Sequence, residues 1–335
     1  MPHIRRSVIL RSRPNGQAVA TNFAVIEDEI PQLRDGEVLK RTLWLSIDPY
    51  MRGRMDDAAS YRAPVRLGEP MTGETVGEVL ESRYPAINVG DTVLGAFGWQ
   101  SHVVTLGASL TVLPSTGAPY STYLGVLGMP GATAFAGLRD IGKPKRGETL
   151  VVAAASGAVG SVVVQLAKRA GAQVVALAGG EEKCSYVREI LGADECIDRR
   201  SVGDLSAALR KACPNGIDVY FESVGGAVQR AVFPLMNDFG RVVMCGMVAE
   251  YNDAEAAPGP SLRSTFTRRL HIQGFIVLDR PENTSDWREY AVPLVASGEI
   301  RYREQVVEGL ENAPQALISL LTGSNEAKLV VHVAD

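Results

Sequence analysis

The sequence predicts an α/β protein that combines a doubly wound parallel sheet with a smaller, irregular β-barrel-like domain. From about residue 123 onward, apolar strand-like runs alternate with amphipathic segments, which is typical of βα units in a parallel sheet. Before residue 120 the strand-like segments are short and interrupted by glycine turns. A length of 335 residues is consistent with two domains.

The bulk composition excludes several classes of partner. The chain is 46% hydrophobic and 21% charged, with a net charge of -4, so electrostatics gives no reason to expect nucleic acid or an anionic membrane as a partner. No apolar run reaches the roughly 18 residues that a membrane span requires. Residues 1–14 are rich in arginine, but no apolar signal-peptide core follows. We therefore expect a soluble, cytoplasmic protein.

The cysteines show no metal-binding pattern. None of the four forms a C-x-x-C pair, and the four histidines do not complete a cluster with zinc-ligand spacing. The cysteines are Cys184, Cys196, Cys213 and Cys245. We expect buried thiols in a reducing compartment and no metal site.

The central motif is a strand, a glycine turn and a helix within residues 149–171. Residues 150–154 form an apolar run typical of a buried parallel strand, and the amphipathic segment beyond the turn ends at Gly171. In such a motif Gly157 lets the backbone approach a pyrophosphate, and Gly160 lets helix and strand pack closely. The N–H groups of the helix N-terminus then face the phosphates. Ala155 stands where G-x-G-x-x-G has its first glycine, so an ordinary βα turn is the alternative.

The second strand of this region predicts which dinucleotide binds. Residues 173–178 end in Gly179 and Gly180, where an NAD site would carry an acidic side chain for the ribose 2′-hydroxyl. The small residues leave room for a 2′-phosphate, and Lys183 lies just beyond them. The sequence therefore favours NADPH over NADH.

Four charged residues near this corner bear on the same choice. Arg199 and Arg200 follow the predicted third strand, residues 195–198, from where they could approach the phosphate corner. Glu181 and Glu182 are unfavourable for a phosphate, although acidic residues also stabilise the first turn of a helix.

The remaining pattern extends both domains. We expect helices at 182–191, 202–212, from 227, and 310–321, and strands at 217–221, 241–245 and 329–333, the last returning to the first domain. First-domain strands are expected at 7–10, 37–46, 75–82, 92–96 and 101–106. The strand ends at Gly157, Ser223 and Gly246 should face one edge of the sheet, where such folds bind ligands. Residues 254–260 are rich in small residues and are expected to form a mobile loop.

One turn of the first domain has residues suited to chemistry. Asp48-Pro49-Tyr50-Met51-Arg52 follows an apolar strand, and we expect it to expose Tyr50 and Arg52 on a loop. A purely structural turn, in which Asp48 caps the residues after it, is the alternative.

With these motifs in place, the chain resembles the zinc-free medium-chain dehydrogenase/reductase superfamily over nearly its whole length. Within that superfamily it is similar to the group of leukotriene B4 12-hydroxydehydrogenases, prostaglandin reductases and alkenal double-bond reductases. The matching stretches are residues 48–52, 128–134, 153–160, Lys183, 225–226, 245–246, 251–252, 274–277, Asn325 and Lys328.

The resemblance implies a Rossmann-type domain at residues 123–306 and a GroES-like substrate and catalytic domain at residues 1–122 and 307–335. It implies NADPH as cofactor and a homodimer. The resemblance and the sequence motifs together predict the following cofactor contacts: Thr133, Gly157, Ala158, Val159, Gly160, Ser161, Gly180, Lys183, Arg199, Ser223, Cys245, Gly246, Phe275, Ile276, Val277 and Asn325. The candidate substrate contacts are Tyr50, Arg52, Met129 and Tyr251.

The implied reaction is hydride transfer from NADPH to the β-carbon of an α,β-unsaturated aldehyde or ketone, followed by protonation of the enolate. Tyr251 matches the tyrosine that holds the enolate oxygen or delivers the proton, and Tyr50 competes for that role. A phenol with a pKa of about 10 is a good hydrogen-bond donor to a developing enolate without a metal.

The sequence departs from the family pattern at two positions, and two other functions are compatible with it. Prostaglandin-type members have a tyrosine where this chain has Arg199 and an asparagine where it has Ser223, which weakens the case for prostaglandin or leukotriene substrates. An NADPH quinone reductase would share the cofactor site without needing Tyr251, and a non-catalytic dinucleotide sensor would need no turnover. A zinc alcohol dehydrogenase is nearly excluded, because its cysteine and histidine ligands are missing from the first domain.

Overall fold

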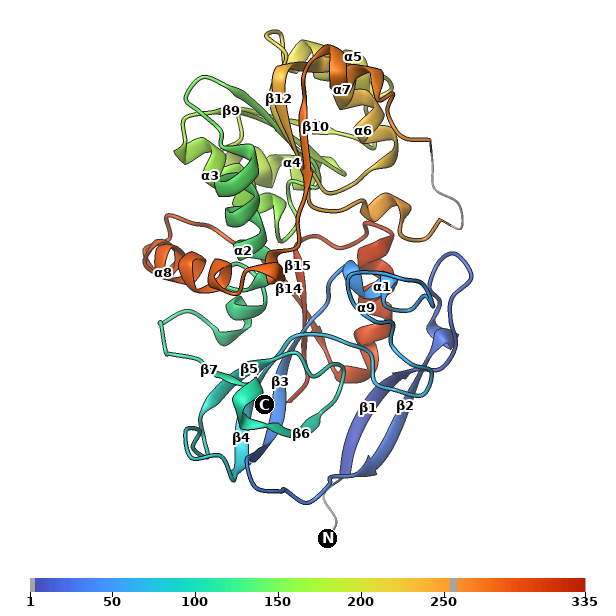
Figure 1. Ribbon diagram of the computed structural model, residues 1–335, viewed down its shortest axis with the longest axis vertical. Helices are drawn as coiled ribbons and strands as arrows, with labels where there is room; N and C mark the ends of the chain where they lie inside the picture. Colours follow the sequence, from blue (N-terminus) through green and yellow to red (C-terminus); the bar gives the residue numbers. More distant parts are fainter. Residues whose placement is uncertain (1–3, 254–257, 335) are drawn as a thin grey trace. The chain divides into compact units, whose positions relative to one another are not determined.

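A computed structural model describes residues 4–253 and 258–334, and it divides the chain into two compact units (Figure 1). The first unit contains Met1–Leu124 and Glu304–Asp335, and the second contains Gly125–Arg303. The predicted combination of a parallel-sheet domain and a separate, mostly antiparallel domain is confirmed.

The second unit is built on a six-stranded, all-parallel sheet with the order β10-β9-β8-β11-β12-β13. The strands are β8 (Thr149–Val152), β9 (Gln173–Ala178), β10 (Glu195–Asp198), β11 (Ile217–Glu222), β12 (Met236–Met244) and β13 (His271–Gly274). All four residues of β8 are buried, as expected for a central strand that is covered on both faces. The strand order reverses direction beside β8, which is where open α/β sheets bind ligands.

Helices cover both faces of this sheet. They are α2 (Met129–Ala136), α3 (Gly160–Arg169), α4 (Glu181–Ser185), α5 (Leu205–Ala212), α6 (Gly226–Val232), α7 (Arg263–Thr267) and α8 (Glu282–Ala296). Helix α2 packs against α3 and α8, whereas α5 packs against α6, and the two groups lie on opposite sides of the strands in Figure 1. The predicted doubly wound arrangement is confirmed.

Local capping explains where two of these helices begin and end. The side chain of Asp204 accepts a hydrogen bond from the Ala207 N–H, so α5 begins at Leu205 and not at residue 202 as predicted. Helix α3 ends just before Gly171, whose φ of +82° terminates it in the expected place.

The first unit has two sheets. Its strands are β1 (Ile4–Leu10), β2 (Phe23–Glu29), β3 (Glu37–Ser46), β4 (Thr75–Ser82), β5 (Thr92–Gly95), β6 (His102–Leu106), β7 (Thr111–Val112), β14 (Glu304–Glu308) and β15 (Lys328–His332). Strands β1 and β2 form an antiparallel pair, and the others form a sheet with the order β14-β15-β3-β4-β5-β7, with β6 paired to β3. The tail strand β15 runs antiparallel to β3, so the predicted return of the C-terminal segment to the first domain is confirmed.

Two short helices complete the first unit, α1 (Tyr50–Gly53) and α9 (Ala313–Leu321). The core between the sheets and α9 contains Trp99, which stacks on Phe23 with ring centroids 5.7 Å apart. Among the described residues, no helix is long and apolar enough to cross a membrane. Of the loop expected at residues 254–260, residues 254–257 lie outside the described part of the chain.

Candidate active site

The turn between β8 and α3 has the geometry of a phosphate-binding loop. A Cβ atom built on Gly160 would lie 2.3 Å from the carbonyl oxygen of Ala154, so only glycine allows this close approach of helix to strand. Ala154 itself adopts a φ of +50°, which is unusual for a residue with a side chain. The strain therefore lies at the turn where the cofactor contacts were predicted.

The same turn presents unpaired backbone donors. The N–H of Gly157 donates to Ala154 and the N–H of Ser161 donates to Gly157. Within residues 4–253 and 258–334, the N–H groups of Ala158 and Val159 have no acceptor. Residues 156–159 are half-buried, so these donors are available to an anion at the start of a ten-residue helix.

The carboxylate of Asp198 joins the tips of β9 and β10. Its Oδ1 accepts the Gly180 N–H at 2.7 Å and the Arg200 N–H at 2.9 Å, and these bonds hold the pKa of Asp198 below its ordinary value. Gly180 adopts a φ of +99°, which favours glycine. Asp198 was not among the residues predicted from the sequence, although its place at the end of a predicted strand was a usable signal.

Arg200 lies against this turn. A Cβ atom on Gly179 would be 3.1 Å from Arg200 Nε, and one on Gly180 would be 3.8 Å from its Nη1. Both arginines are exposed, and the guanidinium group of Arg200 lies beside the two glycines. The Asp198 turn thus holds Arg200 at this corner, and the role predicted for Arg199 stays a prediction.

The two glutamates after Gly180 are paired with arginines. Glu181 Oε1 lies 2.5 Å from Arg188 Nη2, and Glu182 Oε1 lies 3.3 Å from Arg303 Nη2. Both stand in the first turn of α4, as expected. Their charge is thus offset locally, and Lys183 lies half-buried in the same turn.

Glu222 organises the tips of β11 and β12. It is fully buried, and its carboxylate accepts the Val224 N–H at 2.6 Å, the Gly225 N–H at 3.0 Å and the Tyr220 hydroxyl at 2.7 Å. Burial raises the pKa of Glu222 despite these bonds. Its backbone carbonyl also accepts the N–H groups of Cys245 and Gly246. This positioning role was not predicted, because in the sequence Glu222 is an ordinary residue at the end of a strand.

This arrangement leaves a poorly satisfied polar atom where the cofactor was expected. Ser223 Oγ is buried and makes no hydrogen bond of normal geometry among the described residues, with only the weakly polar Cys245 thiol beside it. A buried hydroxyl without a good partner is costly unless a ligand supplies one. Burial also raises the pKa of the Cys245 thiol, so this cysteine stays protonated.

Tyr251 and Gly246, two of the predicted site residues, lie in contact. A Cβ atom on Gly246 would be 2.9 Å from Tyr251 Oη, so the phenol hydroxyl rests against the glycine that follows β12. Tyr251 is half-buried at the end of the short helical turn Val248–Glu250. Glu250 Oε1 accepts the Gly226 N–H at 2.8 Å and ties this turn to the start of α6.

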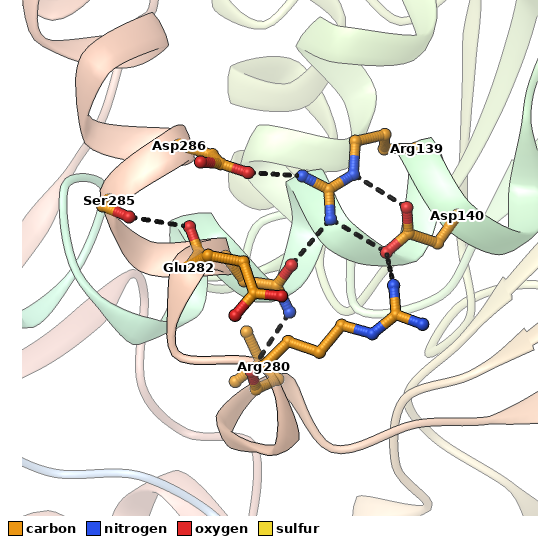
Figure 2. Close-up of polar contacts among 8 residues, drawn as sticks. Arg139, Asp140, Arg280, Glu282, Ser285 and Asp286 are labelled. Atoms are coloured by element: carbon orange, nitrogen blue, oxygen red, sulfur yellow. Dashed lines mark hydrogen bonds and ion pairs between the residues drawn. The ribbon is translucent and has the colours of Figure 1, made fainter.

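The segment after β13 is held by a polar network with α8 (Figure 2). The buried Asn283 donates from Nδ2 to the Val277 carbonyl at 3.2 Å and accepts from Arg139 Nη2 at 2.7 Å. Figure 2 shows Arg139 between Asp140 and Asp286, with Arg280 also directed at Asp140. The network thus fixes the backbone of Val277, one of the predicted cofactor contacts.

The other predicted residues of this unit lie near these elements. The Thr133 hydroxyl bonds back to the Met129 carbonyl at 2.7 Å within α2, and both residues are half-buried. The Phe275 ring faces Gly137, where an added Cβ atom would lie 3.0 Å from its Cζ. Ile276 is half-buried between Phe275 and Val277.

In the first unit, Arg52 is buried and not exposed as predicted. Only 3% of the residue is accessible, and its guanidinium group bonds to Asp56 Oδ1 and the Gly16 carbonyl, both at 2.7 Å. The turn continues into α1, and the chain that follows this helix brings Asp56, four residues after Arg52, to the guanidinium group. These contacts give Arg52 a structural role.

Tyr50 and Asn325 are the remaining candidates in this unit. Tyr50 is half-buried at the first position of α1, and burial, followed by the nearby carboxylates of Asp48 and Glu74, raises its pKa. Asn325 is half-buried before β15, where its Nδ2 donates to the Ala327 carbonyl at 2.9 Å. Tyr50 therefore remains a neutral phenol and a hydrogen-bond donor near neutral pH.

The described residues contain no group of three or more histidine, cysteine or acidic side chains able to hold a metal ion. The chemistry available is instead that of backbone donors, basic side chains at a strand tip, and phenol hydroxyls. A parallel sheet with these features at the carboxyl ends of its strands defines a dinucleotide-binding oxidoreductase unit.

Comparison with known proteins assigns the family. Residues 6–113 match the family described as the N-terminal domain of oxidoreductases, and residues 158–297 match the family described as zinc-binding dehydrogenases. The chain belongs to the zinc-free medium-chain dehydrogenase/reductase superfamily, in the group of alkenal and prostaglandin reductases. The predicted resemblance is confirmed.

Two relatives and one solved structure are similar to this chain over nearly its whole length. The chain is 47% identical to the NADPH-dependent curcumin reductase of Escherichia coli (strain K12), covering 98% of this chain and 97% of the relative. It is 39% identical to the NADP⁺-dependent 2-alkenal reductase of Nicotiana tabacum, covering 98% and 97%. The crystal structure of CurA in complex with NADPH from Vibrio vulnificus superposes with a TM-score of 0.94 at 45% identity, covering 98% of this chain and 99% of that one.

Proposed function

We propose that this protein uses NADPH to reduce the carbon–carbon double bond of α,β-unsaturated ketones and aldehydes. The contact between Tyr251 Oη and Gly246 carries the proposal, because it sets a phenol donor beside the end of β12, where the resemblance implies a cofactor contact. The names of the curcumin and 2-alkenal reductases, which share this chain over nearly its full length, support the same reaction.

The residues present fit NADPH. The unpaired N–H groups of Ala158 and Val159 would hold the pyrophosphate, and the buried Ser223 hydroxyl has no strong protein partner to lose. Lys183 and Arg200 flank the two glycines that leave room for the 2′-phosphate. The backbone that follows β12 and β13 would line the nicotinamide, with Gly246 and Val277 at the points fixed by Glu222 and Asn283.

Bound NADPH supplies a hydride to the β-carbon of the substrate. The chain's own contribution is to hold the carbonyl end: Tyr251 Oη donates a hydrogen bond to the oxygen as it gains negative charge. The bond strengthens as the enolate forms, which lowers the barrier more than it stabilises the bound substrate. The α-carbon then takes its proton from this hydroxyl or from water.

Tyr50 is a second candidate for the same role. Its raised pKa keeps the hydroxyl protonated, as a donor requires. Arg52 is not retained as a substrate contact, because its guanidinium group is already bonded within the unit.

The test is NADPH oxidation at 340 nm with a short 2-alkenal, an aryl enone and a quinone, measured for the wild type, Tyr251→Phe and Tyr50→Phe. We expect enone turnover that falls roughly 100-fold in the variant lacking the true donor, with NADPH affinity unchanged. Quinone turnover alone would replace the proposal with a quinone reductase. NADPH binding without turnover of any substrate would indicate a sensor.

We also propose that the protein is a homodimer. Strand β13 ends the six-stranded sheet, its residues His271, Gln273 and Gly274 are exposed, and an open edge of this kind can pair with a second copy across a two-fold axis. Sedimentation equilibrium that gives a monomer at micromolar concentration would exclude this assembly.

A further inference from the structure

The ammonium group of Lys328 is buried at the start of the tail strand β15. Lys328 is 5% exposed, and its Nζ lies 2.7 Å from Ser46 Oγ, 2.9 Å from the Ile47 carbonyl and 2.7 Å from Asp48 Oδ1. These three acceptors use all three N–H bonds of the ammonium group. All three N–H bonds of the Lys328 ammonium group therefore bond to residues 46–48, at the end of β3 and before α1.

Asp48 completes a closed buried network. Its carboxylate accepts from Lys328 on Oδ1 and from the Ser46 hydroxyl on Oδ2, and the two charged side chains are 5% and 7% exposed. Glu304, the register partner of Lys328 on β14, bonds instead to Ser121 Oγ at 2.7 Å. Glu304 also lies close enough to Lys328 to interact with it electrostatically, and its Oε1 has no hydrogen-bond partner among the described residues. The buried Lys328–Asp48 ion pair fixes the local geometry, and it is costly to break from one side.

The hydrogen-bond network ends at Asp48, two residues before Tyr50, whose hydroxyl is the second candidate hydrogen-bond donor. Pro49 precedes α1, Tyr50 is the first residue of that helix, and the Met51 N–H donates to the Asp48 carbonyl at 3.1 Å. The Ile47 N–H donates to the Leu329 carbonyl at 3.2 Å, which adds a backbone link to the same tail strand. The side chain of Asp48 and the backbone of Ile47 thus anchor the Tyr50 turn to β15.

We propose that Lys328, acting through Asp48, is a positioning residue for Tyr50 in the reductase reaction. The helix α1 has only four residues and no side-chain cap, so its own hydrogen bonds give it little stability. The tail of the chain supplies the missing constraint. The catalytic part of this inference rests on the proposed function, whereas the anchoring of the turn does not.

The catalytic test is a double-mutant cycle that combines Lys328→Met with Tyr50→Phe, measured as kcat for an enone and as NADPH affinity. Misplacing a reacting group by about 1 Å costs roughly 100-fold in rate, so we expect Lys328→Met to lower kcat by about 10- to 100-fold in the wild type. In the Tyr50→Phe background the same change should have less than a twofold effect. NADPH affinity should stay unchanged in both.

Lys40→Met is the matched control, because Lys40 is also a buried lysine and lies on β3, but it bonds to Thr75 and not to residues 46–48. It should leave kcat unchanged. If Lys328→Met does not fold, Lys328→Met/Asp48→Asn removes both charges without leaving one buried and unpaired.

Hydrogen–deuterium exchange over residues 48–55 gives a readout that does not depend on activity. We expect at least tenfold faster exchange in Lys328→Met and wild-type exchange in Lys40→Met. Equal loss of kcat in both Tyr50 backgrounds would overturn the catalytic role and leave the proposed function intact. Unchanged exchange over residues 48–55 would overturn the anchoring itself. If the wild type reduces no enone, the proposed function fails and the exchange data alone decide the anchoring.

Discussion

Gly160 shows how one backbone contact decides whether the phosphate turn can form. Its missing Cβ atom would lie 2.3 Å from the Ala154 carbonyl oxygen and 2.8 Å from the Ala155 Cα, both backbone atoms that cannot rotate away. We expect Gly160→Ala to lower the free energy of unfolding by about 2 kcal/mol or more and to weaken NADPH binding at least tenfold, because α3 must move away from β8. Urea unfolding and a fluorescence titration with NADPH measure the two effects.

Gly203→Ala is the matched control for Gly160→Ala. Gly203 is exposed, nothing lies within 4 Å of its added Cβ atom, and its φ is not in the left-handed region. This variant should keep both stability and affinity near the wild-type values. Equal behaviour of the two variants would show that the turn can relax around a methyl group.

Lys40 is a buried base without an ion-pair partner among the described residues. Its Nζ donates to the Thr75 hydroxyl and lies 5.3 Å from the centre of the Phe97 ring. Burial lowers its pKa from 10.5 to about 7. The folded protein therefore holds Lys40 mostly neutral above about pH 7, while the unfolded chain keeps it protonated up to about pH 10.5.

Because the pKa of Lys40 is lower in the folded protein than in the unfolded chain, the free energy of unfolding depends on pH through this residue. Between about pH 7 and pH 10.5 the unfolded chain binds more protons at this residue, so its contribution to the free energy of unfolding rises with pH. The contribution levels off below pH 7, about 5 kcal/mol lower than at high pH. Urea unfolding from pH 6 to pH 9 should show a steeper rise for the wild type than for Lys40→Met. Parallel curves would mean that Lys40 keeps its ordinary pKa when folded.

At the scale of elements, the link between α8 and the segment after β13 depends on Asn283. Its side-chain amide bonds to both the Val277 carbonyl and Arg139. We expect Asn283→Ala to weaken NADPH binding about tenfold and to cost about 2 kcal/mol of stability, because a buried carbonyl loses its donor and the backbone at Val277 loosens. Isothermal titration with NADPH measures the first effect.

Ser285→Ala is the control on the same helix. Ser285 is exposed, and among the residues that the structure describes its hydroxyl bonds only to the Glu282 carbonyl within α8, so its loss should change affinity by less than twofold. If Asn283→Ala binds NADPH as the wild type does, the segment 275–277 does not line the cofactor.

The sequence predicted the strongly periodic elements well and the weakly patterned ones poorly. The limits of β9 and β10 were predicted correctly, because β9 is a continuous apolar run and both strands border glycine or turn residues. Strands β13 and β14 were missed, since their residues are largely exposed and their pairing depends on partners distant in sequence. Short edge strands carry little apolar signal of their own.

The candidate site shows the same division. The glycine turn, Lys183 and Tyr251 could be found because motif spacing and family resemblance mark them. Glu222 and Asn283 could not be assigned a role, because each acts through hydrogen bonds to backbone groups that only the fold brings near. Asp198 had a signal in its place at the end of a predicted strand, but its partners also depend on the fold. The burial of Arg52 was mispredicted for the same reason, since its partners depend on the course of α1.

At the scale of the whole molecule, the two units have separate hydrophobic cores. Val151, Leu177, Tyr220 and Val242 belong to the core of the second unit, whereas Val8, Trp99 and Leu317 belong to that of the first. A ligand held by backbone groups of the second unit stabilises the folded state by mass action, by about 2.7 kcal/mol at a concentration of 100 Kd. The distribution of this protection along the chain should therefore report where each part of the cofactor binds.

We expect NADPH to slow hydrogen exchange in two segments of the second unit, residues 155–161 and residues 179–183, because the pyrophosphate and the 2′-phosphate contact different strand tips. NADH lacks the 2′-phosphate, so at equal saturation it should protect the first segment and leave the second near its ligand-free rate.

Lys183→Ala/Arg200→Ala should raise the NADPH Kd roughly 10- to 100-fold with little change for NADH, since two charge-assisted contacts are lost only for the phosphate. Arg199→Ala is the control, and it should bind both cofactors as the wild type does. If Arg199→Ala loses its preference for NADPH over NADH while Arg200→Ala keeps it, then Arg199 and not Arg200 binds the 2′-phosphate. Equal protection of residues 179–183 by NADH and NADPH would exclude a phosphate site there.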